Sequence, residues 1–545
     1  MNGYEHYIEL SLTQPTVPWK LNRLLLREVK KRRCFRLISV CCRMICCCLS
    51  YNYCEKELWF MSETRSLVRI CLLFCICFVF CSLIADELRS AEVTEAEARQ
   101  AMQKATKYFT SQVSTEGGYL WLYSQDLKER EGENQAPASR VWVQPPGTPS
   151  VGEAYLKAYQ KTGEPYLLEA AKAAAMALVN GQLKSGGWNY YIDFEDRKAY
   201  QYRVNGGGPK ARNTTTLDDN TTQAALQFLI LIDQELKFKD QPIHEATIYA
   251  LNALLKAQYP NGGWPQRFDS PPDPKDYPVI KANYPESWSR EFPKKKYLDY
   301  YTFNDNLIED LVGVMFLAHH VYQDQRYQQA ALKAGDFIIL AQMPAPQPAW
   351  AQQYNSQMQP AWARKFEPPA VTGGESQGII KTLMQIYIYT GDKKYLKPIP
   401  PALAYLKKSE LPDGKLARFY ELKTNRPLYF TKKYQLTYKD NDLPTHYGFI
   451  IKSGVDSLEG RYQRLLDDSP EKLASMRFPT RRVRLTPSLT AKAKSAIDSL
   501  NSEGAWLRQG DLKASDKENL RIIDTRVFIR NLDTLADFVA ASRKD

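Results

Sequence analysis

The stretch AQYPNGGW at residues 257–264 decides the fold class, because its ending, two glycines followed at once by a large aromatic residue, is repeated in the chain. Gly262-Gly263-Trp264 follows a helical pattern from Ala246 to Gln258, and the same signal occurs at Gly186-Gly187-Trp188 and Gly117-Gly118-Tyr119. The copies are about 69 and about 76 residues apart, which leaves room for two helices and their connections. Such hairpins cannot each bury an apolar face alone, so we expect them to stack into one curved array. Because Gly-Gly also serves as an ordinary helix C-cap, the motif predicts architecture and leaves the chemistry open.

Apolar residues at three- and four-residue spacing predict a mainly helical body between residues 92 and 465. Its first helix should begin at Thr94, with Glu97 three residues on as the partner of a capping box. Further helices are predicted at Gly152–Gln160, Tyr166–Val179, Thr221–Leu236, Ala246–Ala257, Leu307–Tyr322, Gln325–Ala341, Gly378–Tyr389 and Lys394–Lys408.

Long connections rich in proline, glycine and aromatic residues separate these helices. They are Val141–Ser150, Asn189–Asp218, Pro265–Tyr301 and Met343–Thr372. Loops of this length are uncommon in compact domains unless they have a function. We therefore expect them to collect on one face of the helical array and to form a groove.

The N-terminal region reads as processing sequence. Met61 opens a stretch with two arginines and a following apolar run, so residues 61–85 are predicted to be a signal peptide, with a short membrane anchor as the alternative. Residues 1–60 lie upstream of this start methionine and are expected to be a spurious extension. Residues 92–465 would form the catalytic domain and 466–545 a C-terminal helical extension that closes with a helix at Arg526–Ala540. The protein would be secreted or periplasmic, with no membrane association after signal removal, and a monomer.

The amino-acid composition limits the kinds of site that the chain can form. All 11 cysteines lie at or before Cys81, so disulfides, thiolate zinc sites and cysteine nucleophiles are excluded from the rest of the chain. The five histidines are too scattered for a metal cluster. Residues 1–85 carry 12 Lys/Arg and 6 Asp/Glu, which leaves a formal charge of +6 on the remainder. This mild excess permits an acidic substrate without requiring one, and no nucleic-acid partner is expected.

Two acidic clusters open predicted helices. Asp218-Asp219-Asn220 precedes Thr221, and Asn304-Asp305-Asn306 precedes Leu307. N-capping alone explains Asp and Asn at a helix start. Carboxylate and amide oxygens are also the ligands that calcium prefers, so two such clusters after long polar loops indicate a calcium site as the alternative.

Arginines and aromatic residues are interleaved in two later segments. Arg364 lies between Trp362 and a Glu-Pro-Pro turn, and Arg418 and Arg426 flank an aromatic, polar stretch. Aromatic rings stack on sugar faces and guanidinium groups bind carboxylates, which suits a sugar acid. Solvated surface charges and an ordinary strand are the simpler interpretation of the same residues.

Taken together, four segments resemble the pectate lyases of polysaccharide lyase family 10. They are GGWPQRF at 262–268, TFNDN at 302–306, QPAWARKFEPPA at 359–370 and ARFYELKTNRP at 417–427. The resemblance covers roughly residues 95–455. It implies an all-α fold, an α/α toroid of stacked helical hairpins, and calcium-dependent cleavage of polygalacturonate (pectate) by β-elimination.

The resemblance also implies roles for individual residues. Arg364 would be the base that removes the C5 proton, and Asp219 and Asp305 would serve calcium, with Asp219 and Asn220 also near the substrate. Arg418 would bind a uronate carboxylate, with Arg426 beside it. Where the family has a further arginine, this chain has Lys432 and Lys433, which can hold a carboxylate only as point charges. An arginine base has a high reference pKa, about 12.5–13.8, so it needs cationic neighbours and suggests an alkaline optimum.

Three alternatives remain open at the level of sequence. A glycoside hydrolase on a related toroid would use Asp219 and Asp305 as acid and base. A non-catalytic glycan-binding protein would use the same aromatic residues and arginines only to bind. A terpene-cyclase-like toroid would need an acidic, aromatic-lined interior cavity, whereas the long polar loops favour an open groove.

Overall fold

The computed structural model describes residues 93–479, 482–513, 515 and 519–543. The expected extension 1–60 and signal peptide 61–85 lie outside these residues. In the described part, no helix combines the length and apolar character needed to cross a bilayer. The helices are α3 (Glu95–Tyr108), α4 (Thr148–Thr162), α5 (Pro165–Gly181), α6 (Thr221–Glu235), α7 (Gln241–Ala257), α8 (Leu307–Tyr322), α9 (Gln325–Ala341), α10 (Gly374–Thr390), α11 (Ile399–Lys408), α12 (Val455–Asp467), α13 (Pro470–Arg477), α14 (Pro487–Asp498) and α15 (Thr525–Ser542).

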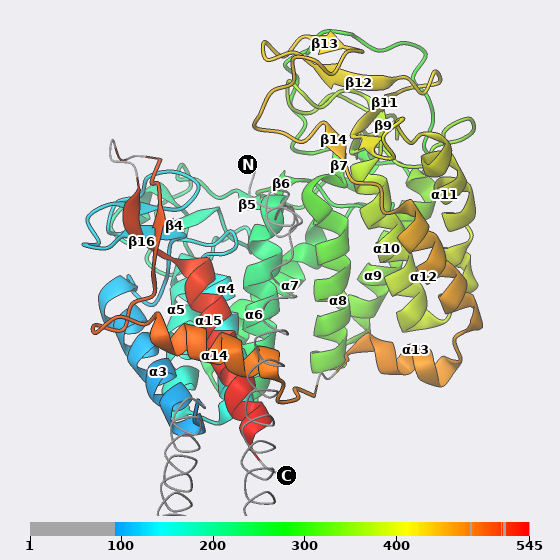
Figure 1. The fold of residues 1–545 in the computed structure, drawn as a ribbon. Helices are drawn as coiled ribbons and strands as arrows, with labels where there is room; N and C mark the ends of the chain where they lie inside the picture. The colour runs from blue at the N-terminus through cyan, green and yellow to red at the C-terminus, as the bar shows by residue number, and fades with distance from the viewer. Residues whose placement is uncertain (1–92, 480–481, 514, 516–518, 544–545) are drawn as a thin grey trace, which may run out of the picture. The chain divides into compact units, whose positions relative to one another are not determined.

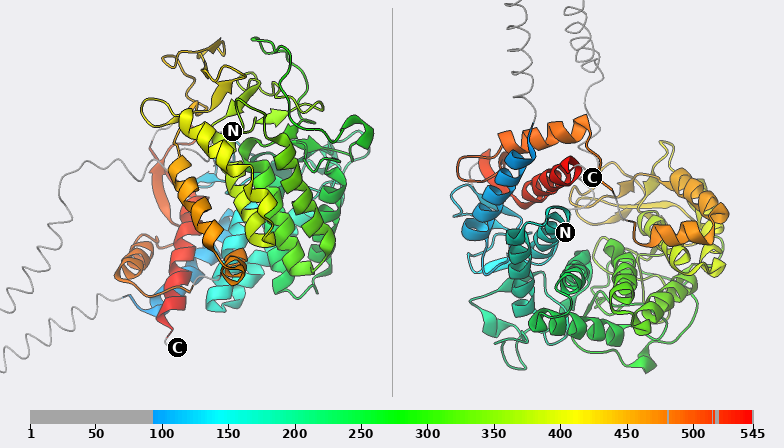
Figure 2. Two further views of the ribbon diagram at one scale, coloured as in Figure 1. Left: turned by 90° about the vertical axis from the view of Figure 1, so that its right-hand side faces the viewer. Right: turned by 90° about the horizontal axis from the view of Figure 1, so that it is seen from below.

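These helices form an α/α toroid, as predicted. Helices α15, α4, α6, α8 and α10 contact one another in that order and form the inner arc, and α3, α5, α7 and α9 contact one another outside it (Figure 2, right). Figure 1 shows the short strands and long connections gathered at one end of the helices. The all-α prediction is confirmed, and the long loops lie at a common end.

The Gly-Gly-aromatic motif joins an outer helix to the loop that leads to the next inner helix. Gly262 has φ +99°, and a Cβ there would lie 2.0 Å from the Lys333 carbonyl of α9. Trp264 is fully buried and its indole N–H donates to the Leu254 carbonyl of α7 at 2.9 Å. The motif therefore fastens one hairpin to the next, because glycine alone permits both this backbone angle and this close approach.

The same indole bond occurs where the sequence pattern is incomplete. Trp188, in the second copy of the motif, donates to the Leu178 carbonyl at 2.8 Å. Trp350 donates to Ile338 and Trp506 to Ala496, both at 2.8 Å, although no Gly-Gly pair precedes either tryptophan. The indole contact therefore also occurs at positions where the sequence does not show the Gly-Gly-aromatic motif.

Segments of the loops pair with one another as short β-strands. They are β1 (Leu122–Ser124), β2 (Arg130–Glu131), β3 (Arg140–Trp142), β4 (Tyr191–Asp193), β5 (Thr215–Thr216), β6 (Arg267–Phe268), β7 (Tyr301–Thr302), β8 (Gln353–Tyr354), β9 (Ala370–Thr372), β10 (Leu416–Ala417), β11 (Phe419–Glu421), β12 (Pro427–Phe430), β13 (Leu436–Thr437), β14 (Ile450–Ile451), β15 (Leu507–Gly510) and β16 (Leu520–Asp524). Two four-stranded sheets have the orders β15-β16-β1-β2 and β13-β12-β11-β9. In the first, β16 pairs with β1, so the last strand of the described residues joins the first.

Two element predictions need correction, and one is confirmed in detail. The single helix expected at Lys394–Lys408 is a 3₁₀ turn at Lys393–Leu396 followed by α11, because Pro398 and its neighbouring prolines cannot donate helical hydrogen bonds. The α7 helix begins at Gln241, five residues before the predicted start, with Pro242 in its first turn. The Thr94–Glu97 capping box is present as predicted.

Candidate active site

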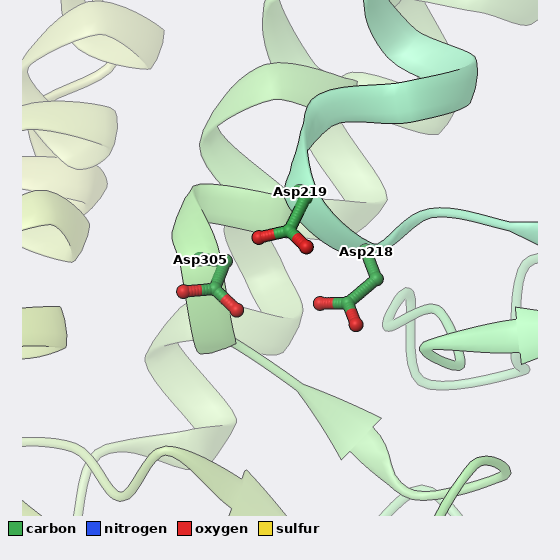
Figure 3. A group of neighbouring side chains, drawn as sticks. All are labelled: Asp218, Asp219 and Asp305. Atoms are coloured by element: carbon green, nitrogen blue, oxygen red, sulfur yellow. The ribbon is translucent and has the colours of Figure 1, made fainter. Parts of the chain in front are cut away.

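Three carboxylates from two neighbouring helix starts meet at the loop end of the inner arc. One oxygen each of Asp218, Asp219 and Asp305 lies within 4.8 Å of the others (Figure 3). Two calcium–oxygen bonds in series span about 4.6–5.2 Å. The spacing therefore allows the three side chains to share one ion of that size.

The local backbone turns these carboxylates toward one another. Asp218–Asn220 and Asn304–Asn306 each form a 3₁₀ turn directly before α6 and α8, and the two turns contact each other. Asp219 has φ 51° and Asp305 has φ 49°, so both lie in the left-handed region that non-glycine residues rarely adopt. Equivalent positions of two adjacent structural repeats thus share the same unusual conformation and face one site.

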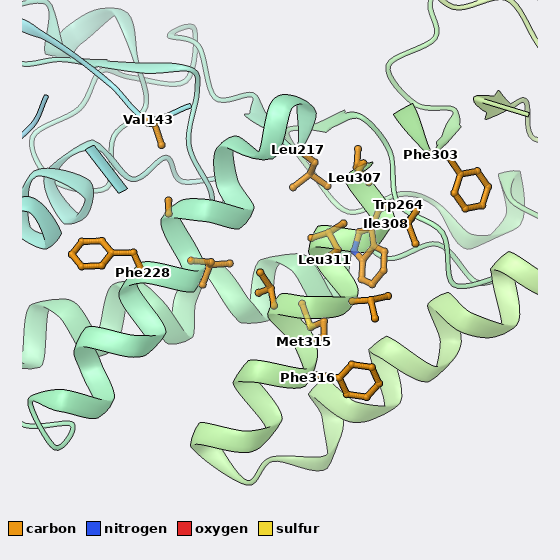
Figure 4. Close-up of a cluster of buried hydrophobic side chains, with 14 of the residues drawn as sticks. Val143, Leu217, Phe228, Trp264, Phe303, Leu307, Ile308, Leu311, Met315 and Phe316 are labelled. Atoms are coloured by element: carbon orange, nitrogen blue, oxygen red, sulfur yellow. The ribbon is translucent and has the colours of Figure 1, made fainter. Parts of the chain in front are cut away.

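Buried apolar side chains flank both acidic turns. Leu217 precedes the first turn and Leu307 follows the second, and both are fully buried in the cluster that also contains Trp264 and Leu311 (Figure 4). Burial of this kind fixes the acidic turns against the core, so the carboxylates have little freedom to move apart when they repel one another.

Burial and mutual repulsion make the ionised form of this carboxylate cluster unfavourable when no cation is bound. Burial, with the charge of Asp218, raises the pKa of Asp219 to about 7, and burial together with the Asp218 charge raises the pKa of Asp305 well above its ordinary value. Asp218 Oδ1 and Asp219 Oδ2 are buried and accept no hydrogen bond from the described residues. Unpaired buried carboxylate oxygens of this kind fit a hard cation as their missing partner.

Arg364 lies beside the cluster, with its side chain 10% exposed. Its Nη2 is 2.7 Å from Glu367 Oε1 and 3.4 Å from Asp305 Oδ2. Burial would lower the pKa of the guanidinium, but the charges of Glu367 and Asp305 outweigh it and raise the pKa well above its ordinary value. The sequence-based expectation of cationic neighbours is therefore not met by these two contacts, which are carboxylates.

A buried polar network connects Arg364 to Arg418. Tyr447 donates to Glu367 Oε1 at 3.2 Å, and Arg418 Nη1 donates to the Tyr447 hydroxyl at 3.3 Å and to Glu375 Oε1 at 3.0 Å. The Arg418 side chain is only 7% exposed and also donates from Nε to the Gly448 carbonyl. The structure thus brings Arg418 near Arg364 through Tyr447 and Glu367, as part of a buried network.

The other predicted binding residues have contacts in other parts of the chain. Asn220 is the N-cap of α6, next to Asp219. Arg426 lies over the Tyr438 ring at 3.5 Å, and Lys432 is 3.9 Å from Asp442. Arg426, Lys432 and Lys433 are all exposed, and these contacts of Arg426 and Lys432 are with the β13 region and the loop after it.

Several residues at the site were missed by sequence reasoning. Asp218 was noted in its cluster but given no role, and Glu367 was seen only as part of a turn. Arg267 lies in the GGWPQRF segment but has no role in the sequence analysis, and Tyr190 does not appear there, although Tyr190 donates to Asp218 Oδ2 at 2.8 Å and Arg267 donates to the Tyr190 hydroxyl at 3.1 Å. The doubled aspartate and the GGWPQRF and QPAWARKFEPPA segments are the signals that the sequence offers, whereas the contacts of Tyr190 join loops far apart in the chain.

The helices form an α/α toroid, and comparison with known families indicates which class of enzyme the chain resembles. Residues 182–415 match the family described as pectic acid lyase. This match includes the Asp218, Asp305 and Arg364 segments and confirms the resemblance to the pectate lyases. No curated protein matches the sequence significantly.

Solved structures with a similar fold include enzymes acting on several sugars. A mutant of a family 10 polysaccharide lyase from Cellvibrio cellulosa, in complex with trigalacturonic acid, is 20% identical, covers 58% of this chain and 98% of its own, and has a TM-score of 0.41. The α-mannanase of family GH76 from Bacteroides thetaiotaomicron is 11% identical, covers 82% and 95%, and has a TM-score of 0.37. Cellobiose 2-epimerase from Bacillus thermoamylovorans is 14% identical, covers 82% and 98%, and has a TM-score of 0.39.

Proposed function

We propose that this protein is a pectate lyase, exported by its N-terminal leader, that cleaves polygalacturonate by calcium-assisted β-elimination with Arg364 as the base. The observation that carries the proposal is the position of Arg364 beside three converging carboxylates with unpaired buried oxygens. An arginine for the proton and a carboxylate cluster for a cation are the two elements that this reaction requires.

In the proposed reaction, the C5 proton of a galacturonate unit moves to Arg364, a double bond forms between C4 and C5, and the bond from C4 to the glycosidic oxygen breaks. The departing oxygen keeps the electron pair of that bond and takes up a proton from water. When bound at Asp218, Asp219 and Asp305, calcium would neutralise the carboxylate next to C5 and offset the negative charge beside Arg364. Glu367 holds the guanidinium in place through Nη2, and Tyr447 in turn holds Glu367. Arg418, Arg426, Lys432 and Lys433 are proposed to bind further uronate carboxylates.

The raised pKa of Arg364 has a consequence for the pH dependence. The base must be deprotonated to accept the C5 proton, and the fraction of neutral guanidine increases with pH. Activity should therefore increase toward alkaline pH.

The test is turnover of polygalacturonate, followed by the ultraviolet absorption of the unsaturated product. Loss of a general base typically reduces the rate by about 10²–10⁴. Arg364→Ala should show this loss while oligogalacturonate binding stays nearly intact, and Arg364→Lys should recover little. Chelation of calcium should abolish turnover, and calcium should restore it.

Arg326→Ala is the matched control, because Arg326 forms an exposed ion pair with Asp324 at the far end of α8 from Asp305. Near-normal turnover of Arg364→Ala would contradict the assignment of the base. Binding of oligogalacturonate by the wild-type protein without any turnover would instead identify a glycan-binding protein.

A glycoside hydrolase is the second candidate, and one observation favours it. The pKa of Asp219, raised to about 7 chiefly by burial, is in the range of a general acid at neutral pH. The products decide between the two reactions, since hydrolysis cleaves the chain without forming an ultraviolet-absorbing double bond.

A further inference from the structure

Arg267 is held at the edge of the acidic cluster by the pairing of two loop strands. Thr216 in β5 pairs with Arg267 in β6, and the Leu217 N–H donates to the Gln266 carbonyl at 2.9 Å. Asp218 directly follows this paired segment. The strand pairing therefore places Arg267 and Asp218 side by side, although they are far apart in the sequence.

The contact of Arg267 with the cluster is indirect. Its Nη2 donates to the Tyr190 hydroxyl at 3.1 Å, and that hydroxyl donates to Asp218 Oδ2 at 2.8 Å. The direct separation of Arg267 Nη2 from Asp218 Oδ2 is 3.8 Å, longer than a charge-assisted hydrogen bond. The Nε donor of Arg267 is buried and makes no hydrogen bond to the described residues.

Accessibility separates Arg267 from the other two arginines of the site. The Arg267 side chain is 27% exposed, against 10% for Arg364 and 7% for Arg418. Arg364 and Arg418 each contact a buried glutamate at 3.0 Å or less. Arg267 is thus the most exposed of these three side chains, and it lies beside Asp218.

We propose that Arg267 binds the free carboxylate of a uronate unit at the acidic cluster and so makes the site selective for unesterified over methyl-esterified substrate. The inference rests on the proposed function for the identity of the sugar. A guanidinium recognises a carboxylate by paired, charge-assisted hydrogen bonds, which a methyl ester cannot accept with comparable strength. Tyr190 is the positioning residue, since its hydroxyl holds both Arg267 and Asp218.

The experiment measures binding, so that its outcome does not depend on turnover. Trigalacturonate and its methyl ester are titrated calorimetrically, with calcium present, into Arg364→Ala protein and into the same protein carrying Arg267→Gln. Hydrogen bonds to charged groups are typically worth 1.5–3 kcal/mol, so the loss should weaken trigalacturonate binding about 10- to 100-fold. Binding of the methyl ester should weaken less than about 3-fold, since the ester offers no charge to lose.

Arg267→Lys should retain part of the preference as a point charge, and it replaces Arg267→Gln if the latter fails to fold. Arg326→Gln, an exposed arginine that pairs with Asp324 and lies over Tyr327, is the matched control and should change neither affinity. Equal weakening for acid and ester, or no weakening, would overturn the proposal, because Arg267 would then act only by supporting Asp218 or not at all. Absence of unsaturated product from the wild-type protein would contradict the lyase proposal. The ratio of the affinities for trigalacturonate and its methyl ester would still decide the role of Arg267.

Discussion

At the scale of single residues, Arg418 shows how a sequence-based role and a structural role can coincide in one side chain. The resemblance assigns it to substrate binding, whereas the structure pairs it with Glu375, whose side chain is 6% exposed. A guanidinium that compensates a buried carboxylate is needed for folding whether or not it also contacts substrate. The two roles therefore predict different readouts for one substitution.

We predict that Arg418→Gln destabilises the protein, because it removes the positive charge opposite Glu375. Breaking one side of a buried ion pair typically costs about 3–5 kcal/mol. Urea unfolding should show a loss of this order, and the double variant Arg418→Met with Glu375→Leu should regain part of it. Arg426→Gln is the contrast, since Arg426 is exposed, and its effect should stay within about 0.5 kcal/mol. Unchanged stability of Arg418→Gln together with weaker oligogalacturonate binding would assign Arg418 to the substrate alone.

At the scale of elements, the first glycine of each repeated motif lies against the next outer helix. A Cβ at Gly117 would lie 2.2 Å from the Ala173 carbonyl of α5, and one at Gly186 would lie 2.1 Å from the Ala253 side chain of α7. The glycine backbone lies directly against the next outer helix at both points, so the motif sets the spacing between adjacent hairpins. The loops that follow Gly186 and Gly262 lead to the two acidic turns, so the spacing of the hairpins also sets the spacing of these turns.

We predict that Gly262→Ala is among the more destabilising glycine substitutions. The new Cβ would meet the Lys333 carbonyl at 2.0 Å and would also sit at φ +99°. Gly391→Ala is the matched control, because Gly391 has φ +71° as the C-cap of α10 but no heavy atom within 4 Å of the built Cβ. The control should lose about 1 kcal/mol from backbone strain alone, and Gly262→Ala distinctly more. Similar melting temperatures for the two variants would show that the close approach is easily relaxed.

At the scale of the whole folded unit, the last described helix packs against the first. Helix α15 contacts α3 and α4, and its Phe528 stacks on Phe109 with ring centroids 3.8 Å apart. The boundary predicted at residue 465 separates these helices in sequence but not in packing. The helices after it are therefore expected to stabilise the domain before it.

We predict that Phe528→Ala destabilises the whole described unit in a single transition. Loss of a buried phenylalanine typically costs about 3–5 kcal/mol. Far-ultraviolet circular dichroism and intrinsic fluorescence should report the same shifted midpoint. Arg530→Ala, an exposed position of the same helix, should leave the midpoint nearly unchanged. Two separate transitions, with only the second affected, would show that residues 466–545 fold as an independent extension.

The sequence by itself determined the helical class, most helix positions and the segments that carry the site. Periodicity, capping residues and the Gly-Gly-aromatic signal are local, so they can be read along the chain, and α8 and α9 have the predicted bounds. The acidic turns were visible for the same reason, because Asp and Asn before a helix are a local pattern.

Only the tertiary structure decided which residues meet. The convergence of Asp218 with Asp305, the contact of Arg364 with Asp305, and the contact of Arg267 with Tyr190 depend on how successive hairpins stack and how their loops pair. Such contacts join positions up to about 90 residues apart, and no single-sequence pattern encodes their distances. The burial that pairs Arg418 with Glu375 and raises the pKa of Asp219 is likewise a property of the packed molecule, because it exists only after water has been excluded from the site.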